Sequence, residues 1–399
     1  MVSNPDQTAY SDETLPEALR SEQALHDPFG WYDRMRRDSP VRYDRQRDVY
    51  DVFTHEHVKT ALQDDERFHR KELSRSHMSP TDPFTYLDNA MIWSDGPAHK
   101  QGKSQLFEYF RPTLLEGFRD SIREVSESQL ETALESGPAF DFIDEYAVPV
   151  PLRVIMDIVG VPQEDHRRML AWLETFREVM NSEYSAAEST DGERMAAAVE
   201  YLQGVIAERK QDPKNDLVSR LITETDLTDA EVGSNCFDFI LAGQGTMSEF
   251  LSNALYLFAE EGLLESIGDH ELDVVLEEVL RYRTPLQSRA RETAEAVTVG
   301  GTEIPAGETV ILWIGSANRD PACYDRAGEF LPDRDPEHLA FGSGSHTCIG
   351  APLARLQAPI VLRTFLEAVE EIEIVHDGIG PKPKASKLGF ERLPVSVER

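Results

Sequence analysis

The chain has few basic residues and little cysteine. Of its 399 residues only 40 are lysine or arginine, against 73 acidic residues, which gives a formal net charge of −33. No basic stripe is present to neutralise phosphates, so we do not expect nucleic-acid binding. The three cysteines, Cys236, Cys323 and Cys348, are too few and odd in number for a disulfide framework. They indicate a reducing, cytoplasmic compartment instead.

Long hydrophobic runs are missing as well. No run of eighteen apolar residues occurs, so we expect no membrane span. The stretch from Met1 to Gln7 has neither a basic start nor an apolar core, so no secretory signal is visible. Hydrophobic residues make up 40% of the chain and no linker divides it. We therefore expect a loose N-terminal arm over residues 1–25 and a single domain over residues 26–399.

The acidic surplus is spread along the whole chain, and only nine residues are lysine. At low salt such a surface repels itself and destabilises the compact state. At molar salt the Debye length falls to about 3 Å, and the repulsion is largely screened. We interpret the composition as that of a halophilic protein from a high-salt cytoplasm. An acidic face for a basic partner is the alternative, which the even spread of the acids disfavours.

Hydrophobic periodicity predicts a mainly α fold with a smaller β region. Glycine and proline turn signals interrupt the helical pattern and flank short runs rich in valine and isoleucine. Short strands are expected at 41–43, 49–53, within 298–315 and in the C-terminal tail; helices are expected at 55–62, over most of 97–262 and at about 350–370.

One cysteine lies in a loop punctuated by glycine. Residues 341–350 read FGSGSHTCIG, and a helix is expected to follow directly. Gly342 and Gly344 let the backbone turn tightly and bring its N–H groups close to the sulfur of Cys348, while Gly350 keeps bulk away from the ligand side. The following helix directs its positive end at the sulfur. This arrangement predicts a metal-bound thiolate with one face of the metal open. A buried structural cysteine is the alternative.

The loop resembles the haem-binding loop of the cytochrome P-450 family, which reads Phe-Gly-x-Gly-x-His-x-Cys-x-Gly, and every fixed position is filled. The resemblance implies that Cys348 is the axial ligand of the iron of haem b. It implies that Phe341, Gly342 and Gly350 shape the cofactor side of the loop. It also implies a single-domain fold in which the haem lies between a long central helix and the helix after the cysteine loop.

The resemblance also implies which residues hold the haem propionates. Arg291 and His346 match propionate-binding positions of the family. His99 and Lys103, four residues apart on one predicted helix, match its His-x-x-x-Arg pair. Lys103 replaces the family's arginine, and a lysine neutralises a carboxylate as a point charge without a bidentate fork. The alternative for His99 and Lys103 is an ordinary surface position.

Glu278 and Arg281 lie three residues apart on a predicted helix, on one face. Alone, this spacing is typical of a surface ion pair worth less than about 1 kcal/mol. The resemblance implies a different role, in which Glu278, Arg281 and Arg334 form a structural network beside the cysteine loop.

The longest predicted helix begins near Thr228, which forms a capping box with Glu231, and ends near Gly262. Its middle contains Gly243 and Gly245, and a glycine inside a helix costs about 1 kcal/mol relative to alanine. Glycines there fit a flat cofactor close to the backbone or a local bulge. Close packing of two helices is the alternative.

This segment resembles the family's Ala-Gly-x-(Asp/Glu)-Thr pattern. The resemblance implies that Ala242 lies against the cofactor and that the Thr246 hydroxyl manages protons on the oxygen side. Gly245 occupies the position of the acid, so the proton source is open. Gln244 or Glu249 with ordered water, a hydroxyl of the substrate, or the use of peroxide are the alternatives. We favour a water relay past Thr246.

The substrate and the electron source follow from the resemblance. Segments 71–94 and 176–194 are expected to contact substrate, and the first contains Met78, Phe84, Tyr86 and Met91, which suit a small apolar molecule. The chain has no flavin or dinucleotide fingerprint, so a ferredoxin or similar carrier with its reductase must deliver electrons. We expect docking by local contacts near Arg355.

The predicted function is therefore a monooxygenase that inserts one oxygen atom from O2 into a small apolar substrate. Two alternatives remain open. One is a peroxide-driven haem-thiolate enzyme, and the other is a non-catalytic haem protein that binds a gas or an apolar ligand.

Overall fold

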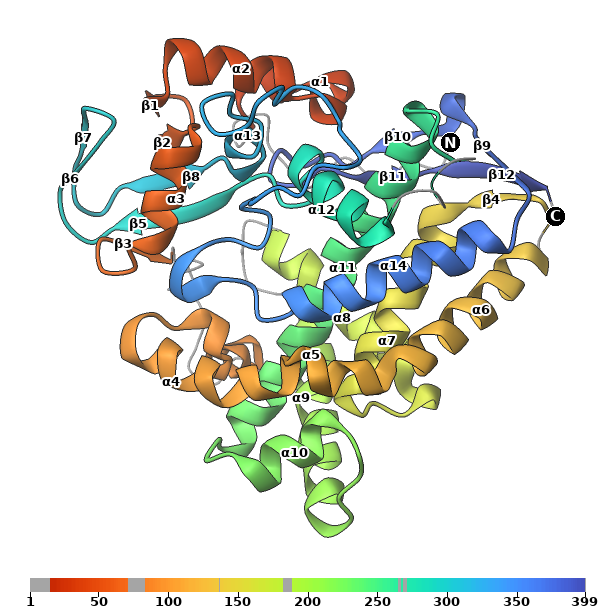
Figure 1. Cartoon of the computed structure of the whole chain (residues 1–399). Coiled ribbons are helices and arrows are strands. Elements are labelled where there is room, and N and C mark those ends of the chain that lie inside the picture. The colour runs from red at the N-terminus through yellow and green to blue at the C-terminus, as the bar shows by residue number, and fades with distance from the viewer. Residues whose placement is uncertain are drawn as a thin grey trace. The chain divides into compact units, whose positions relative to one another are not determined.

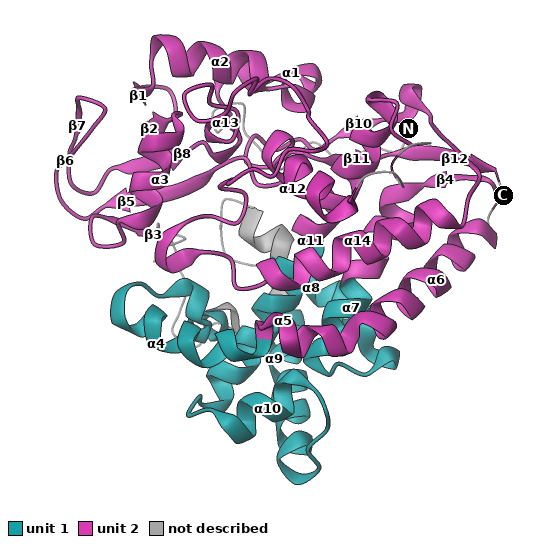
Figure 2. Cartoon of the chain, in the orientation of Figure 1, with its two compact units in different colours: residues 1–11, 72–109, 152–244 teal, residues 12–71, 110–151, 245–399 magenta. Residues whose placement is uncertain are grey.

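The computed structural model describes residues 15–70, 83–135, 137–181, 189–264, 267 and 271–398. These residues form two compact units (Figure 2), one of residues 83–109, 152–181 and 189–244 and a second of residues 15–70, 110–135, 137–151, 245–264, 267 and 271–398. Met78 and parts of the expected substrate segments lie outside the described residues.

The first unit is helical. Its helix α9 packs against α8 and α10. Asp216 begins α10, where its side chain accepts a hydrogen bond of 2.8 Å from the Ser219 N–H and satisfies a free donor of the first turn. The same carboxylate lies 2.6 Å from Nε of Arg209 on α9, which joins the two helices. The helices of this unit are α4 (Gly96–Phe107), α8 (His166–Asn181), α9 (Ser189–Gln211) and α10 (Leu217–Glu224), with most of α7 (Pro149–Val159) and the first half of α11 (Asp229–Glu260).

The second unit combines helices with all the β strands of the described chain. Its complete helices are α1 (Glu22–His26), α2 (Phe29–Asp38), α3 (His55–Gln63), α5 (Pro112–Leu115), α6 (Arg119–Glu135), α12 (Leu272–Tyr282), α13 (Ile314–Ala317) and α14 (Ala351–Glu367). Its strands are β1 (Val41–Asp44), β2 (Val49–Val52), β3 (Phe68–Arg70), β4 (Ala139–Asp141), β5 (Arg289–Thr293), β6 (Val297–Val299), β7 (Thr302–Ile304), β8 (Thr309–Leu312), β9 (Glu371–Ile374), β10 (Gly380–Pro381), β11 (Phe390–Arg392) and β12 (Pro394–Glu398).

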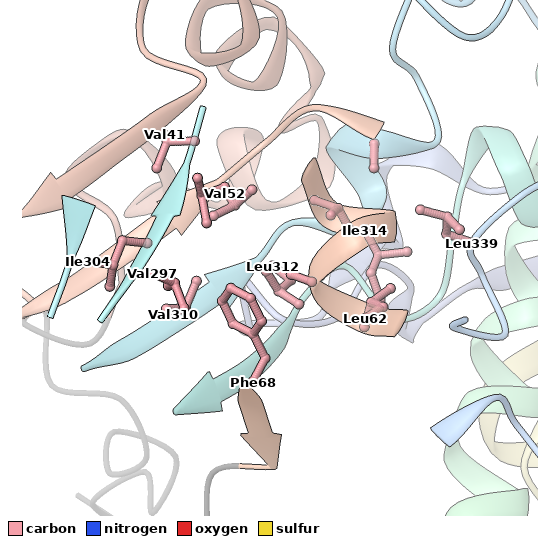
Figure 3. Packing of buried hydrophobic residues seen from close by; sticks show 14 residues of the cluster. Val41, Val52, Leu62, Phe68, Val297, Ile304, Val310, Leu312, Ile314 and Leu339 are labelled. Atoms are coloured by element: carbon pink, nitrogen blue, oxygen red, sulfur yellow. The ribbon is translucent and has the colours of Figure 1, made fainter. Parts of the chain in front are cut away.

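The largest sheet has five strands in the order β1-β2-β8-β5-β3. Strands β2 and β8 run parallel, and the other pairs are antiparallel. Alternate residues of β8, Val310 and Leu312, are fully buried, as expected for a strand with one face on a core. They pack with Leu62 of α3 and with Leu339 in one cluster (Figure 3). Leu339 therefore anchors the chain two residues before the cysteine loop begins.

Helix α11, labelled in Figure 1, is the longest helix of the described residues, and its first half belongs to the first unit and its second half to the second. The predicted capping box at its start is confirmed. The Thr228 N–H donates to the Glu231 carboxylate at 2.7 Å, and the Glu231 N–H donates to the Thr228 hydroxyl at 3.3 Å. In the second unit, α14 packs against α6, α5 and α12.

The predicted helices and strands are largely confirmed, including 41–43, 49–53 and 55–62. The expectation of a loose arm up to residue 25 does not hold for residues 15–25. Leu19 and Leu25 are buried in a cluster with Trp31 and Trp313, and Leu15 and Ala24 pack against it, so the apolar residues of this short segment dock it onto the core. No helix in the described part of the chain is long and apolar enough to cross a membrane.

Candidate functional site

The cysteine loop lies in the second unit, between Leu339 and α14. The Cys348 N–H donates to the Phe341 carbonyl at 2.8 Å, which closes the loop at both ends. Gly342 and Gly344 have φ of +75° and +77°, the left-handed region that glycine adopts at little cost. Cys348 is exposed, whereas Cys236 is buried. The alternative of a buried structural cysteine therefore applies to Cys236 and not to Cys348.

Gly344 is also required by a close approach. A Cβ at this position would lie 2.6 Å from the Leu62 carbonyl oxygen and 2.8 Å from Cα of Gln63, at the end of α3. Any side chain would push the loop away from α3. Gly350 has no such restriction, since a Cβ there would lie 3.8 Å from the Cys348 sulfur, an ordinary van der Waals distance.

Helix α14 begins three residues after Cys348, with Gly350 as its N-cap and proline in its first turn. The positive dipole end of α14 lies at this start, where it favours an anionic group such as a thiolate. The approach to the loop is fixed by Asn318, whose side-chain oxygen accepts a hydrogen bond of 2.7 Å from the Leu339 N–H.

Arg355, one turn into α14, belongs to a charged network beside this loop. Its guanidinium donates to both carboxylate oxygens of Glu277 on α12, at 2.7 and 2.8 Å. Its Cζ lies 4.6 Å from the centre of the Phe341 ring. His338 Nε2 donates to Glu277 at 3.0 Å, because His338 Nδ1 accepts from the Ala340 N–H at 3.2 Å. Three segments near Cys348 are thus joined through one carboxylate.

The electrostatics of this network favour the charged forms. Burial alone would raise the pKa of Glu277, but the hydrogen bonds from Arg355 and His338 outweigh it and lower the pKa to about 2. The hydrogen bond to Glu277 raises the pKa of Arg355, and Cys348 raises it further. The guanidinium is therefore a fixed positive charge that interacts with the Cys348 sulfur.

We expect Glu277→Gln to lower the free energy of unfolding by roughly 3 kcal/mol at pH 7. The pKa of Glu277 falls from 4.5 to about 2 on folding, so its contribution is complete above pH 4.5 and is lost as pH falls towards 2. Urea unfolding across this range should therefore show wild type and variant converging. Asp273→Asn, on the exposed side of α12, controls for the loss of one charge. A difference in unfolding free energy between wild type and Glu277→Gln that does not change with pH would contradict the lowered pKa of Glu277.

Glu278, Arg281 and Arg334 are brought together. Glu278 and Arg281 are fully buried, and two bonds of 2.6 and 2.7 Å join them. Nε of Arg334 lies 3.3 Å from Glu278 Oε1. Arg281 also donates to the carbonyls of three residues on the connection towards the cysteine loop: Asn318 at 3.0 Å, Ala327 at 2.9 Å and Glu329 at 2.9 Å. This geometry differs from a surface ion pair and supports the structural role.

Arg291 and His346 lie in the same unit as Cys348. Arg291 is a buried residue of β5, and its Nη1 donates to the Ala290 carbonyl at 2.9 Å. His346 ends a short 3-10 helix, Gly344–His346, two residues before Cys348, and is half-buried.

His99 and Lys103 lie on α4 of the first unit, one helical turn apart. His99 is buried, and its Nδ1 donates to the Met91 carbonyl at 3.0 Å, which assigns the proton to that nitrogen. The Met91 N–H donates to the Asn235 side chain on α11 at 3.0 Å. His99 is therefore oriented by its surroundings and is not a mobile surface residue.

The two glycines of α11 have different surroundings. A Cβ at Gly243 would contact Ile155 of α7 at 3.4 Å, so this glycine serves close packing of two helices. A Cβ at Gly245 would have no atom of the described residues within 4 Å. Gln244 is buried, Thr246 is half-buried and Ala242 is exposed. A Cβ at residue 245 therefore meets no described residue, unlike a Cβ at Gly243.

A haem fits what Cys348 offers. The sulfur is a single, exposed soft ligand at a helix start, and haem iron takes one such axial ligand because the porphyrin supplies the equatorial ones. When bound, the haem would supply the chemistry that activates O2.

The sequence did not indicate two charged clusters. The Glu277–His338–Arg355 network joins residues far apart in the chain, and only Arg355 was expected near the site. Lys382 and Lys387 contact Glu249, which was considered only as a proton relay. The gathering of lysines at 382–387 was the available signal for this cluster.

Comparisons with known proteins give a consistent result. Residues 271–397 match the family model described as cytochrome P-450. Cytochrome P-450 109 of Bacillus spizizenii is 31% identical, over 97% of this chain and 96% of its own. Cytochrome P-450 119 of Sulfolobus acidocaldarius is also 31% identical, over 93% of this chain and 99% of its own.

Two solved structures show the same fold. Substrate-free CYP109E1 from Bacillus megaterium superposes with a TM-score of 0.84, at 29% identity, over 93% of this chain and 98% of its own. P450BioI, in complex with an acyl carrier protein ligated to hexadec-9Z-enoic acid, gives a TM-score of 0.86 at 27% identity, over 94% of this chain and 99% of its own.

Proposed function

This chain belongs to the cytochrome P-450 family of haem monooxygenases, and from this premise we propose that it inserts one oxygen atom from O2 into a small apolar organic substrate. The observation that carries the proposal is the exposed Cys348 at the start of α14, held in a loop that fits one axial thiolate. The cofactor we propose is haem b.

We propose the following roles for residues around the cofactor. Cys348 supplies the axial thiolate, and Phe341, Gly342 and Gly350 line its loop. Arg291, His346, His99 and Lys103 hold the propionates, which need cations or donors when they are partly buried.

On the oxygen side, Thr246 holds water and passes protons, and Ala242 offers the short side chain that a flat group requires. Gly245 provides no acid, so protons must come along water past Thr246, with the buried Gln244 as a further polar group on the same helix. The relay through Glu249 is less favoured, because two lysines hold its carboxylate.

We propose that electrons come from a ferredoxin or similar carrier with its reductase, which docks by local contacts around Arg355. Two hollows of about 470 and 410 Å³ flank this side chain, and both are also lined by Glu277 and Asp335. The surface around Arg355 is mixed in charge. With a net charge of −33, long-range attraction of an acidic carrier is not expected. The sparse cysteines support a cytoplasmic location.

A peroxide-driven reaction is the second candidate function. Gly245 favours it, because an enzyme that receives its oxygen already reduced has less need of a proton donor at that position. Turnover with hydrogen peroxide alone, compared with turnover on O2 with a reductase and ferredoxin, separates the two.

The deciding measurement is the absorbance difference spectrum of the reduced protein with carbon monoxide, in molar salt. We expect a strongly red-shifted Soret band from haem bound through the Cys348 thiolate. A haem band without the shift would indicate another ligand and favour a non-catalytic haem protein. A folded protein that binds no haem would rule out the proposed function.

A further inference from the structure

Lysine gathers at one place in this chain. Three of its nine lysines, Lys382, Lys384 and Lys387, lie within six residues, in a chain of net charge −33. Two of them contact one carboxylate of α11. Nζ of Lys387 lies 3.0 Å from Glu249 Oε2, and Nζ of Lys382 lies 3.5 Å from Glu249 Oε1. The cluster thus contains one anion and two cations.

The surplus positive charge is partly removed from water. Glu249 is 2% exposed, and the side chains of Lys382 and Lys387 are 28% and 24% exposed. Burial lowers the pKa of Lys387, and Lys382 and Arg289 lower it further, while Glu249 raises it. One lysine would suffice to neutralise Glu249, so the second creates a field that favours another anion.

Backbone contacts hold the segment of Lys382 and Lys387 against α11, close to Thr246. The Leu388 N–H donates to the Pro285 carbonyl at 2.9 Å, and Asn253 of α11 donates to the Leu388 carbonyl at 2.9 Å. A Cβ at Gly389 would lie 2.9 Å from Glu249 Cγ, so the backbone lies directly against the helix. Glu249 follows Thr246 by three residues, which places their Cβ atoms about 5–6 Å apart.

The ammonium groups retain hydrogen-bonding capacity. Each lysine has three N–H donors, and the contact with Glu249 uses one of them. Leu286 forms a backbone bridge with Lys387 and provides an apolar neighbour. A ligand with an anionic end and an apolar body suits this combination.

We propose that Lys382 and Lys387 bind the carboxylate end of an amphiphilic substrate, with Glu249 holding both ammonium groups in position. This inference rests on the proposed monooxygenase function and changes its substrate class from a wholly apolar molecule to one with an anionic end. Lysines act here as point charges without a fixed bidentate geometry, so the site selects charge more than the shape of the head group.

The test is calorimetric titration of the holoenzyme in molar NaCl with dodecanoate, 1-dodecanol and methyl dodecanoate. These ligands share the apolar chain and differ in charge. We expect dodecanoate to bind at least about tenfold more tightly than either neutral ligand, because its carboxylate accepts charge-assisted hydrogen bonds. Equal affinities for the three ligands would contradict a carboxylate-binding site at Lys382 and Lys387.

Variants locate the effect. Lys387→Met should abolish the preference for dodecanoate, and Lys387→Arg should keep most of it. Lys382→Met, expected to weaken the preference, provides a second measurement if Lys387→Met does not fold. Lys210→Met removes a lysine paired with Asp229 at the surface and should leave the preference unchanged. The same loss in Lys210→Met and Lys387→Met would contradict the proposal.

The carbon monoxide spectrum of each sample separates the two levels of inference. If the carbon monoxide spectrum shows the red-shifted Soret band but dodecanoate binds no more tightly than the neutral ligands, only the proposed carboxylate site at Lys382 and Lys387 is overturned. If the Soret band is missing, the proposed function is overturned. The calorimetric comparison of dodecanoate with the neutral ligands needs no spectral signal, so it still shows whether Lys382 and Lys387 bind a carboxylate.

Discussion

Arg281→Met is expected to cost about 3–5 kcal/mol of the free energy of unfolding, a large part of the stability of an ordinary protein. The substitution leaves the buried Glu278 carboxylate with one of its two arginines and three carbonyls without a donor from residue 281. An uncompensated buried charge is much more costly than a lost surface contact. Urea unfolding at constant molar NaCl measures the effect.

Arg326→Met is the matched control. Arg326 and Glu329 are also three residues apart, but their side chains are 54% and 56% exposed. Removing this pair should cost less than about 1 kcal/mol. Similar losses in the two variants would mean that the Glu278–Arg281 pair contributes no more than a surface ion pair, in spite of its burial.

Gly245→Asp should raise the product formed per electron severalfold in the reaction with O2, since a positioned general acid typically contributes about 10²–10⁴-fold to proton transfer. Among the described residues no atom lies within 4 Å of a Cβ at this position, so the first side-chain atom of an aspartate meets none of them. The readout is product and released hydrogen peroxide per electron delivered.

Gly245→Asn separates acidity from bulk. It has nearly the same shape as aspartate and cannot donate a carboxylic proton, so it should not raise the yield. An unchanged yield in Gly245→Asp would mean that another proton route already serves the enzyme. A gain shared by both variants would assign the effect to helix stabilisation, because both remove a glycine from α11.

Local sequence signals predicted the elements that depend on neighbouring residues. Thr228 and Glu231 are three residues apart, so their capping box could be identified without knowledge of the fold. The turns of the cysteine loop were predicted for a similar reason, because ten consecutive residues contain both its glycines and Cys348.

Ion pairs between residues far apart in the sequence could not be predicted in this way. Glu277 and Arg355 are 78 residues apart, and Glu249 and Lys387 are 138 apart. On an amphipathic helix a charged residue indicates a solvated face, and only tertiary contacts decide whether it is buried. The packing of Leu19 and Leu25 was missed because the apolar residues of 15–25 lie in a stretch too short, and too interrupted by polar residues, to give a clear helical period.

The contact of Gly344 with the end of α3 has a consequence for the order of assembly. The loop that carries Cys348 is fitted against a helix that ends at Gln63, almost three hundred residues earlier in the chain. During synthesis α3 leaves the ribosome long before this loop exists, and N-terminal regions begin to fold first. The loop can pack against α3 only after its own residues have been synthesised, and contacts between residues so far apart in the chain form slowly. Capture of the cofactor therefore belongs to the end of biogenesis, when the chain is nearly complete.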